Sequence, residues 1–323
     1  MKTLVTGAGG FIASHLVEKL LHKGHEVRAF VRYNSRNLWG WLEDSLCRDS
    51  VEIISGDVRD YDLVKSAVEG CDTVFHLAAL IGIPYSYVSP LAYVRTNVEG
   101  TYNILQAARE CNVGRIIHTS TSEIYGTAQY VPIDEAHPVN PQSPYAASKA
   151  SADFLALSYH RSFGLPVTVV RPFNTYGPRQ SARAIIPTVI SQILDGKKSL
   201  SLGNLTPTRD LTFVSDTVSG FLAAAVSPQT VGETVNLGTG SEISIGDLVA
   251  KIAYIMGREV KITSDEQRVR PAKSEVERLL SNPGKMHALT GWKADVSLDE
   301  GLARTVEWMK ERRSLYKSGI YNV

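Results

Sequence analysis

Tyr145 and Lys149 are four residues apart at the start of a predicted helix. Ser143 is a good N-cap residue for this helix, and Pro144 fits its first turn. At this spacing the two side chains share one helix face, where the ammonium group favours the phenolate form of the tyrosine. The pair therefore predicts a tyrosine with a lowered pKa that acts as a general base.

The spacing alone is a weak signal, because Tyr61 and Lys65 share it on a segment that we expect to be an ordinary surface helix. Position favours Tyr145, since its helix follows the fifth strand-like run, 115–119. The C-terminal end of such a strand faces the crevice of a parallel sheet. Two hydroxyls and a carboxylate follow this run: Thr121, Ser122 and Glu123. Taken alone, that stretch is more typical of a polar loop with a solvated carboxylate.

A glycine-rich turn, 7–10, separates the first strand-like run from the first amphipathic stretch. Glycines allow a tight turn and a close approach to phosphate, and the following helix N-terminus offers free N–H groups. The turn therefore predicts dinucleotide binding. Ala13 replaces the usual third glycine, which helix–strand packing tolerates. The expected contacts are Gly7, Gly10, Phe11 and Ile12.

The second strand-like run lacks the acidic residue that usually binds the ribose 2′-hydroxyl. Arg32 stands there instead, and with Arg36 it fits a 2′-phosphate as well as it fits a solvated surface position. The choice between NAD and NADP therefore stays open. Asp57 follows the third run and is either a contact of the adenine edge or a turn residue.

Six apolar runs alternate with helical segments in the first half of the chain, which predicts a parallel sheet with helices on both faces. We expect a doubly wound α/β Rossmann domain of residues 1–175 with a returning piece at about 211–239. A smaller mixed α/β lobe of about 176–210 and 240–323 would bind the substrate. The predicted strands are 3–6, 27–31, 51–55, 73–77, 115–119 and 167–171, and 234–237 is a further one.

Composition excludes several classes of protein. The 323 residues carry 34 Lys+Arg and 33 Asp+Glu, a net charge of +1, which gives no basic surface for nucleic acid. No apolar run is long enough to span a membrane, and the first strand begins too early for a signal peptide. Three scattered cysteines indicate neither disulfides nor a metal site. We therefore expect a cytoplasmic protein without a metal.

The motifs together resemble the extended short-chain dehydrogenase/reductase family of sugar-nucleotide epimerases and dehydratases. The resemblance covers almost the whole chain. It rests on the glycine turn, Asp57-Val58, His76-Leu77-Ala78-Ala79, Asn97, Ser120-Thr121, Tyr145 with Lys149, and the stretch 171–179 (RPFNTYGPR). It implies a tightly bound, internally recycled NAD or NADP. The cofactor contacts that it adds are Arg32, Asp57, Val58, Leu77, Ala78, Ala79, Asn97, Tyr145, Lys149 and Phe173.

The resemblance also implies roles in a 4,6-dehydration. Tyr145 takes the proton from the sugar O4, Lys149 supports it and holds the nicotinamide ribose, and Thr121 orients O4. Glu123 removes the C5 proton before water leaves from C6. Many related dehydratases carry an aspartate where this chain has Ser122, so the acid for the leaving hydroxyl stays unassigned between Glu123 and a water. Asn174, Arg183, Arg209 and Arg270 match positions that bind the substrate.

Three segments narrow the resemblance to dehydratases of legionaminic-acid-type pathways, which act on UDP- or GDP-activated N-acetylglucosamine. They are 33–42, 180–187 and 265–271, while Thr121-Ser122-Glu123 resembles GDP-mannose 4,6-dehydratases. UDP-glucuronate decarboxylases share this triplet and are the first alternative. A 4-epimerase, which needs no base for C5, and a dinucleotide sensor without turnover are the others.

The resemblance implies a homodimer that pairs the helical segments near 92–110 and 146–162. Both segments carry more apolar residues than one face requires, which fits burial on two sides. Packing against the sheet alone would also explain them. The residues concerned are Tyr93, Val98, Ile104, Leu105, Phe154, Leu155, Leu157 and Tyr159.

Overall fold

The computed structural model describes residues 1–318; the last five residues of the predicted C-terminal lobe, 319–323, lie outside the described part. Its centre is a seven-stranded sheet in the order β11-β6-β5-β4-β1-β2-β3, and all six strand pairs are parallel. The predicted doubly wound α/β fold is confirmed. The strands are β1 (Lys2–Thr6), β2 (Glu26–Arg32), β3 (Val51–Gly56), β4 (Thr73–His76), β5 (Arg115–Thr119), β6 (Val167–Pro172) and β11 (Thr234–Leu237).

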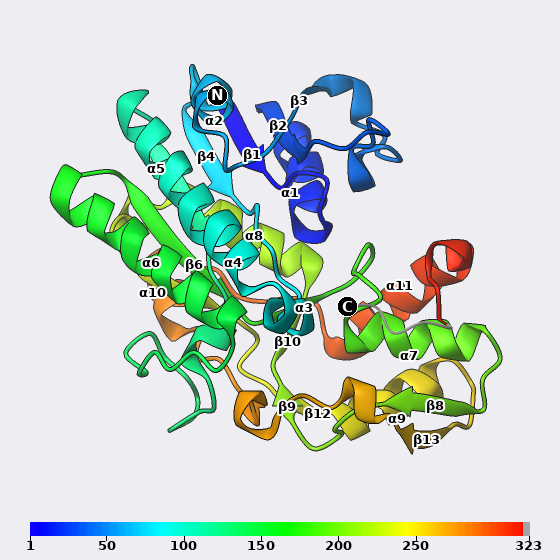
Figure 1. Cartoon of the computed structure of the whole chain (residues 1–323). Helices are drawn as coiled ribbons and strands as arrows, with labels where there is room; N and C mark the ends of the chain where they lie inside the picture. The colour runs from blue at the N-terminus through cyan, green and yellow to red at the C-terminus, as the bar shows by residue number, and fades with distance from the viewer. Residues whose placement is uncertain (319–323) are drawn as a thin grey trace.

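Helices cover both faces of this sheet (Figure 1). One face packs on α1 (Phe11–His22) and α8 (Val214–Val226). The other face packs on α2 (Tyr61–Val68), α5 (Gly100–Glu110) and α6 (Pro144–Phe163). Two-sided burial explains why the strands are nearly continuous apolar sequences.

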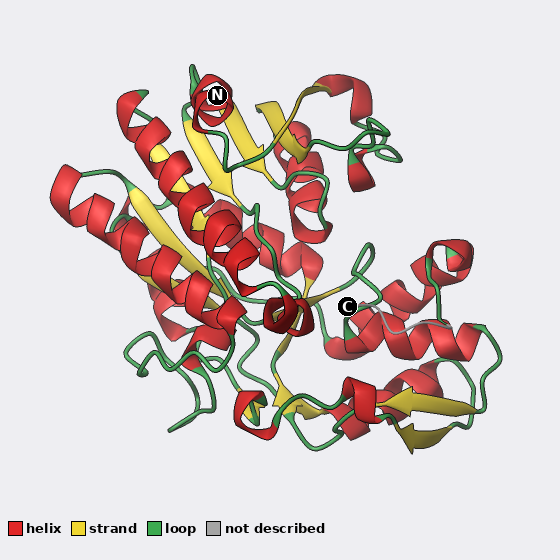
Figure 2. Cartoon of the chain, viewed as in Figure 1, coloured by secondary structure: helices red, strands yellow, loops and turns green. Residues whose placement is uncertain are grey.

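A smaller lobe of helices and short strands lies beyond the C-terminal edge of the sheet (Figure 2). Its helices α7, α9 and α11 pack on one another, and their apolar residues join the core cluster of the α1 side. Its helices are α7 (Ile185–Leu194), α9 (Ile245–Ile255) and α11 (Leu298–Glu311). Its strands are β7 (Asn174–Tyr176), β8 (Ser199–Leu202), β9 (Thr208–Arg209), β10 (Leu211–Phe213), β12 (Ile243–Ser244), β13 (Lys261–Ser264) and β14 (Arg278–Leu279). Helix α10 (Gly284–Thr290) packs instead against β11 and α8 at the edge of the large sheet (Figure 1).

The predicted helix at 92–110 differs from the structure in its first half. It consists of α4 (Pro90–Tyr93), a π-helical segment η3 (Val94–Glu99) and α5, and a short helix α3 (Ile83–Val88) precedes it. π-Helical turns are rare in proteins, and those that occur are often found at functional sites. No local pattern indicated this π-helical turn, because the apolar spacing of the segment continues across it.

No helix among residues 1–318 is long and apolar enough to cross a membrane. The same residues contain no group of three or more His, Cys, Asp or Glu side chains that could bind a metal ion. Cys47, Cys71 and Cys111 are all free thiols.

Candidate active site

The glycine turn fits the phosphates of a dinucleotide. Gly10 is the N-cap of α1, no side chain caps the helix, and its first turn holds no acidic residue. The helix N-terminus therefore offers its N–H groups to an anion. Gly7 has φ +68°, and a Cβ there would lie 2.9 Å from the backbone of Ala78. At Gly9 a Cβ would lie 2.3 Å from the Trp39 carbonyl oxygen, so neither Gly7 nor Gly9 accepts a side chain.

The predicted loop 77–79 is attached to this turn through a buried threonine. Thr6 Oγ1 accepts hydrogen bonds from the N–H groups of Leu77 and Ala78, each at 3.1 Å. The same hydroxyl lies 2.8 Å from His76 Nδ1. The ends of β1 and β4 therefore form one rigid wall where the sequence predicts the cofactor.

Replacing Gly7 by alanine should weaken dinucleotide binding at least tenfold and lower the melting temperature. Left-handed backbone costs a non-glycine residue roughly 1–2 kcal/mol, and here the new Cβ also collides with Ala78. Gly24→Ala is the matched control, because Gly24 has φ +79° and nothing within 4 Å of its would-be Cβ. Calorimetric titration with NAD and thermal unfolding measure both effects. Equal affinities for the two variants would contradict the phosphate site.

Asn97 and Phe173 are both buried and make contacts within the protein. Asn97 lies in the π-helical segment η3 with 1 % of its surface exposed. Its side chain bonds both backbone groups of Leu80, at 2.8 and 2.9 Å, and Ser148 Oγ at 2.9 Å. Phe173 is buried against Tyr125. The side chain of Asn97 therefore fixes the 77–80 loop. The direct contact of Asn97 with the cofactor stays a prediction.

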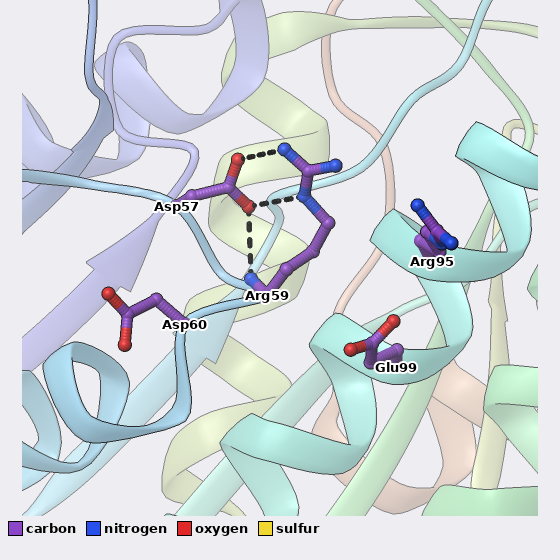
Figure 3. A pocket seen from close by; sticks show the side chains of 5 residues that line it. All are labelled: Asp57, Arg59, Asp60, Arg95 and Glu99. Atoms are coloured by element: carbon purple, nitrogen blue, oxygen red, sulfur yellow. Dashed lines mark hydrogen bonds and ion pairs between the residues drawn. The ribbon is translucent and has the colours of Figure 1, made fainter.

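The predicted ribose and adenine end is open and highly charged. Arg32 is exposed at the end of β2. Asp57 Oδ1 and Oδ2 accept hydrogen bonds from Arg59 Nε and Nη2, at 2.8 and 2.5 Å. This pairing is the largest cause of the lowered pKa of Asp57. Figure 3 shows that Asp57 and Arg59 share a pocket with Asp60 and with Arg95 and Glu99 of η3. The buried Val58 is the apolar neighbour of Asp57.

The predicted catalytic groups meet between the end of β5 and the start of α6. Ser143 caps α6 through Ala146 N–H at 3.1 Å, which sets the first turn that carries Tyr145. Thr121 Oγ1 accepts from Glu123 N–H at 3.2 Å and begins the short 3₁₀ helix η4 (Ser122–Tyr125). Ser122 is buried in it.

The electrostatics of this pair differ from the expectation. Burial raises the pKa of Tyr145, the Glu123 charge adds to the rise, and a hydrogen bond with Thr121 opposes it. The predicted lowering by Lys149 is therefore wrong for the protein alone, because desolvation is the largest influence on the pKa of Tyr145 and Lys149 is not among its main causes. Burial also lowers the pKa of Lys149 to about 8. The Lys149 ammonium donates to the carbonyl oxygen of Thr119 at the end of β5.

Two of the predicted substrate arginines come together in the smaller lobe. Arg209 and Arg270 lie 3.4 and 3.6 Å from the same carboxylate oxygen of Glu275. Asn174 Oδ1 is buried with no hydrogen-bond partner among residues 1–318, which is uncommon for a buried polar atom. Arg183 lies elsewhere: its Nη1 is 3.1 Å from where a Cβ of Gly82 would sit.

Sequence reasoning missed two residues of this region. Glu275 is an acidic residue in a loop that no spacing links to Arg209. Asp153 is buried one helical turn beyond Lys149. The i+4 spacing from Lys149 to Asp153 was a signal that could have found it.

Comparison with known proteins identifies the family. Residues 4–305 match the sequence model of the GDP-mannose 4,6 dehydratase family. The chain belongs to this family. It is therefore an enzyme of the extended short-chain dehydrogenase/reductase type that groups sugar-nucleotide dehydratases with epimerases.

Individual relatives of both activities match over nearly their whole length. A dTDP-glucose 4,6-dehydratase of Streptomyces antibioticus is 34% identical over 98% of this chain and 95% of its own. A UDP-glucose 4-epimerase of Mycolicibacterium smegmatis is 35% identical, covering 97% and 99%. The structure of DesIV, a dTDP-glucose 4,6-dehydratase of Streptomyces venezuelae solved with NAD bound, is 32% identical over 98% and 99% with a TM-score of 0.89.

Proposed function

We propose that this enzyme is a sugar-nucleotide 4,6-dehydratase whose substrate is UDP- or GDP-N-acetylglucosamine and whose product is the 4-keto-6-deoxy sugar nucleotide. The observation that carries the proposal is the carboxylate of Glu123, two residues from Thr121 and electrostatically coupled to Tyr145. A dehydratase needs a base for the C5 proton. A 4-epimerase does not.

The proposed chemistry uses the residues at the β5–α6 junction. Thr121 positions the sugar O4, and Tyr145 takes its proton while Lys149 supplies the neighbouring positive charge. Bound NAD would accept the hydride from C4 and return it to C6. The 4-keto group then acidifies the C5 proton, which Glu123 removes and delivers to the hydroxyl that leaves C6 as water, giving a C5–C6 double bond. Hydride addition at C6 leaves a carbanion at C5, which takes a proton from solvent, and Tyr145 releases the O4 proton to solvent. Tyr145 is buried, with 8 % of its surface exposed, so the surrounding protein keeps water away from it.

The proposed substrate class rests on the three segments of the narrower resemblance. Each contacts a different part of the candidate site. The backbone of Trp39 packs against Gly9 of the phosphate turn. Arg183 packs over Gly82 beside Tyr93. The ring centroids of Tyr93 and Tyr145 are 6.2 Å apart. Arg270 joins the Arg209 cluster. The planar guanidinium groups of that cluster suit the diphosphate, with Asn174 as a further donor or acceptor.

Incubation with a panel of sugar nucleotides in deuterated water tests the proposal. The panel is UDP- and GDP-N-acetylglucosamine, GDP-mannose, dTDP-glucose, UDP-glucose and UDP-glucuronate. The expected result is loss of one water and gain of one deuterium at C5 for an N-acetylglucosamine nucleotide. Dehydration of dTDP-glucose instead would correct the substrate. A changed C4 configuration without a mass change would favour the epimerase, as the 35% identical relative suggests.

We further propose that the enzyme is a homodimer paired through α4–η3–α5 and α6. These helices keep apolar side chains on the surface: Leu91, Val94, Tyr102, Phe154 and Phe163. Of the residues expected at this interface, four are buried within the chain instead: Tyr93, Ile104, Leu105 and Tyr159. Light scattering at micromolar concentration should give the dimer mass. Phe154→Asp should give the monomer, and a wild-type monomer would contradict the interface.

A further inference from the structure

Asp153 is a buried carboxylate that contacts no part of the predicted substrate path. It lies on α6 one turn beyond Lys149, with 1 % of its surface exposed. Its Oδ2 accepts from Ser120 Oγ at 2.7 Å and from Arg171 Nε at 3.1 Å. Ser120 immediately precedes Thr121, so this carboxylate ties the catalytic end of β5 to α6.

Lys149 contacts the same strand end from the same helix. Its ammonium donates to the Thr119 carbonyl oxygen, the residue before Ser120. The two side chains are four residues apart and therefore neighbours on one helix face. Together they hold the last residue of β5 and the residue that follows it, which fixes Thr121 where the chain enters η4.

The charge of Asp153 is maintained by its surroundings. Arg171 comes from β6, and its Nη1 donates to Tyr125 OH at 2.9 Å, which in turn donates to Asn236 Oδ1 at 2.8 Å. His118 Nε2 of β5 lies 3.2 Å from Asp153 Oδ1. Burial raises the pKa of Asp153, but the interaction with His118, the charge of Arg171 and the hydrogen bond from Ser120 outweigh burial and lower it. An ionised carboxylate therefore persists beside Lys149 at neutral pH.

We propose that Asp153 is a positioning residue for catalysis, which clamps the end of β5 through Ser120 and keeps Lys149 in its charged form. The proposal rests on the roles proposed above for Tyr145 and Lys149. It extends them to a residue that touches neither substrate nor cofactor.

Of the titratable groups around Lys149, Asp153 is the one whose charge stabilises the ammonium form of the lysine. Burial lowers the pKa of Lys149, and Asp153 is the charge that raises it. The histidines of the neighbouring strands, His76 on β4 and His118 on β5, are both buried, and burial lowers the pKa of each, so both are neutral near pH 7. On α6 itself, burial raises the pKa of Tyr145, which keeps the phenol neutral as well. Two other charged groups nearby interact with neighbours of Lys149. Arg171 forms an ion pair with Asp153, and the charge of Glu123 raises the pKa of Tyr145.

An NMR titration of the protein labelled with ¹³C at the lysine Cε atoms tests whether Asp153 keeps Lys149 charged, and it needs no substrate. The Lys149 signal is assigned by its absence from Lys149→Arg. In Asp153→Asn we expect the Lys149 pKa to fall by about one unit, since a neighbouring opposite charge shifts a pKa by one unit or more. Asp216→Asn is the control, because Asp216 is a buried carboxylate on α8 that binds the N–H groups of Asp295 and Val296. An unchanged Lys149 pKa in Asp153→Asn would overturn the proposal.

Ser120→Ala tests the clamp and covers the case in which Asp153→Asn does not fold. With a substrate turned over by the wild type, we expect kcat to fall about tenfold at unchanged KM, and Ser120→Thr to restore it. In Asp153→Asn the alkaline limb of the kcat profile should also move to lower pH, because Lys149 loses its proton earlier. Equal kcat for Ser120→Ala and the wild type would overturn the clamp. A wild type inactive on the whole panel would instead reject the proposed function, while the titration still decides the role of Asp153.

Discussion

Replacing Tyr145 by phenylalanine should lower kcat by about 10³-fold, within the range of general-base contributions. The tyrosine oxygen is the proposed acceptor of the O4 proton. Phenylalanine keeps the ring contact with Tyr93 and the burial, so the fold should be unaffected. The measurement is kcat and KM with the substrate identified on the panel, together with NAD affinity, which should change little.

Tyr61→Phe is the matched control for this variant. Tyr61 and Lys65 have the same spacing on α2, but Lys65 there pairs with Glu110 at 2.6 Å. We expect wild-type kcat for Tyr61→Phe. A Tyr145→Phe enzyme that keeps more than about a tenth of its activity would place the base elsewhere.

Replacing Glu123 by glutamine should separate the two halves of the reaction. Oxidation at C4 depends on Tyr145 and Thr121 and should proceed, whereas removal of the C5 proton should slow by about 10²- to 10⁴-fold. Because dehydration then stalls after the first oxidation, the reduced nicotinamide should accumulate with the 4-keto sugar nucleotide. Its ultraviolet absorbance in a single turnover, and deuterium at C5 by mass spectrometry, give the two measurements.

The control for Glu123 is Glu233→Gln, which removes an exposed carboxylate paired with Lys285. It should behave as the wild type in both measurements. If Glu123→Gln still incorporates deuterium at C5 at the wild-type rate, Glu123 is not the base. If the wild type never incorporates deuterium while it inverts C4, the enzyme is an epimerase and the carboxylate has no catalytic part.

The wound sheet was predictable because its signals are local. Each buried parallel strand is a short apolar run, and each run was found to within a residue or two at either end: the run predicted at 27–31 is β2, Glu26–Arg32. The predicted strand 234–237 is β11, and it joins the sheet edge next to β6. The short strands β9, β12 and β14 were missed, since two residues each carry no period.

The parts of the candidate site that could be predicted are those whose residues lie close together in the sequence, within one turn of the chain or of a helix. The glycine turn, the Ser143 cap and the Tyr145–Lys149 spacing all fall in this class, and the structure shows the positive φ at Gly7 and the cap at Ala146. The π-helical segment and the side-chain hydrogen bonds of Asn97 were not predictable. Those bonds reach Leu80 and Ser148, 17 and 51 residues away.

The sequence by itself determined the fold class, the family and the set of residues able to do chemistry, because spacing along a strand, turn or helix fixes which side chains share a face. Only the tertiary structure decided how those residues are paired and charged. Burial raised the Tyr145 pKa against the expected influence of Lys149, and it brought Arg209 and Arg270 to one carboxylate of Glu275. Desolvation and contacts between distant segments arise only when the chain is packed, so no local pattern contains them.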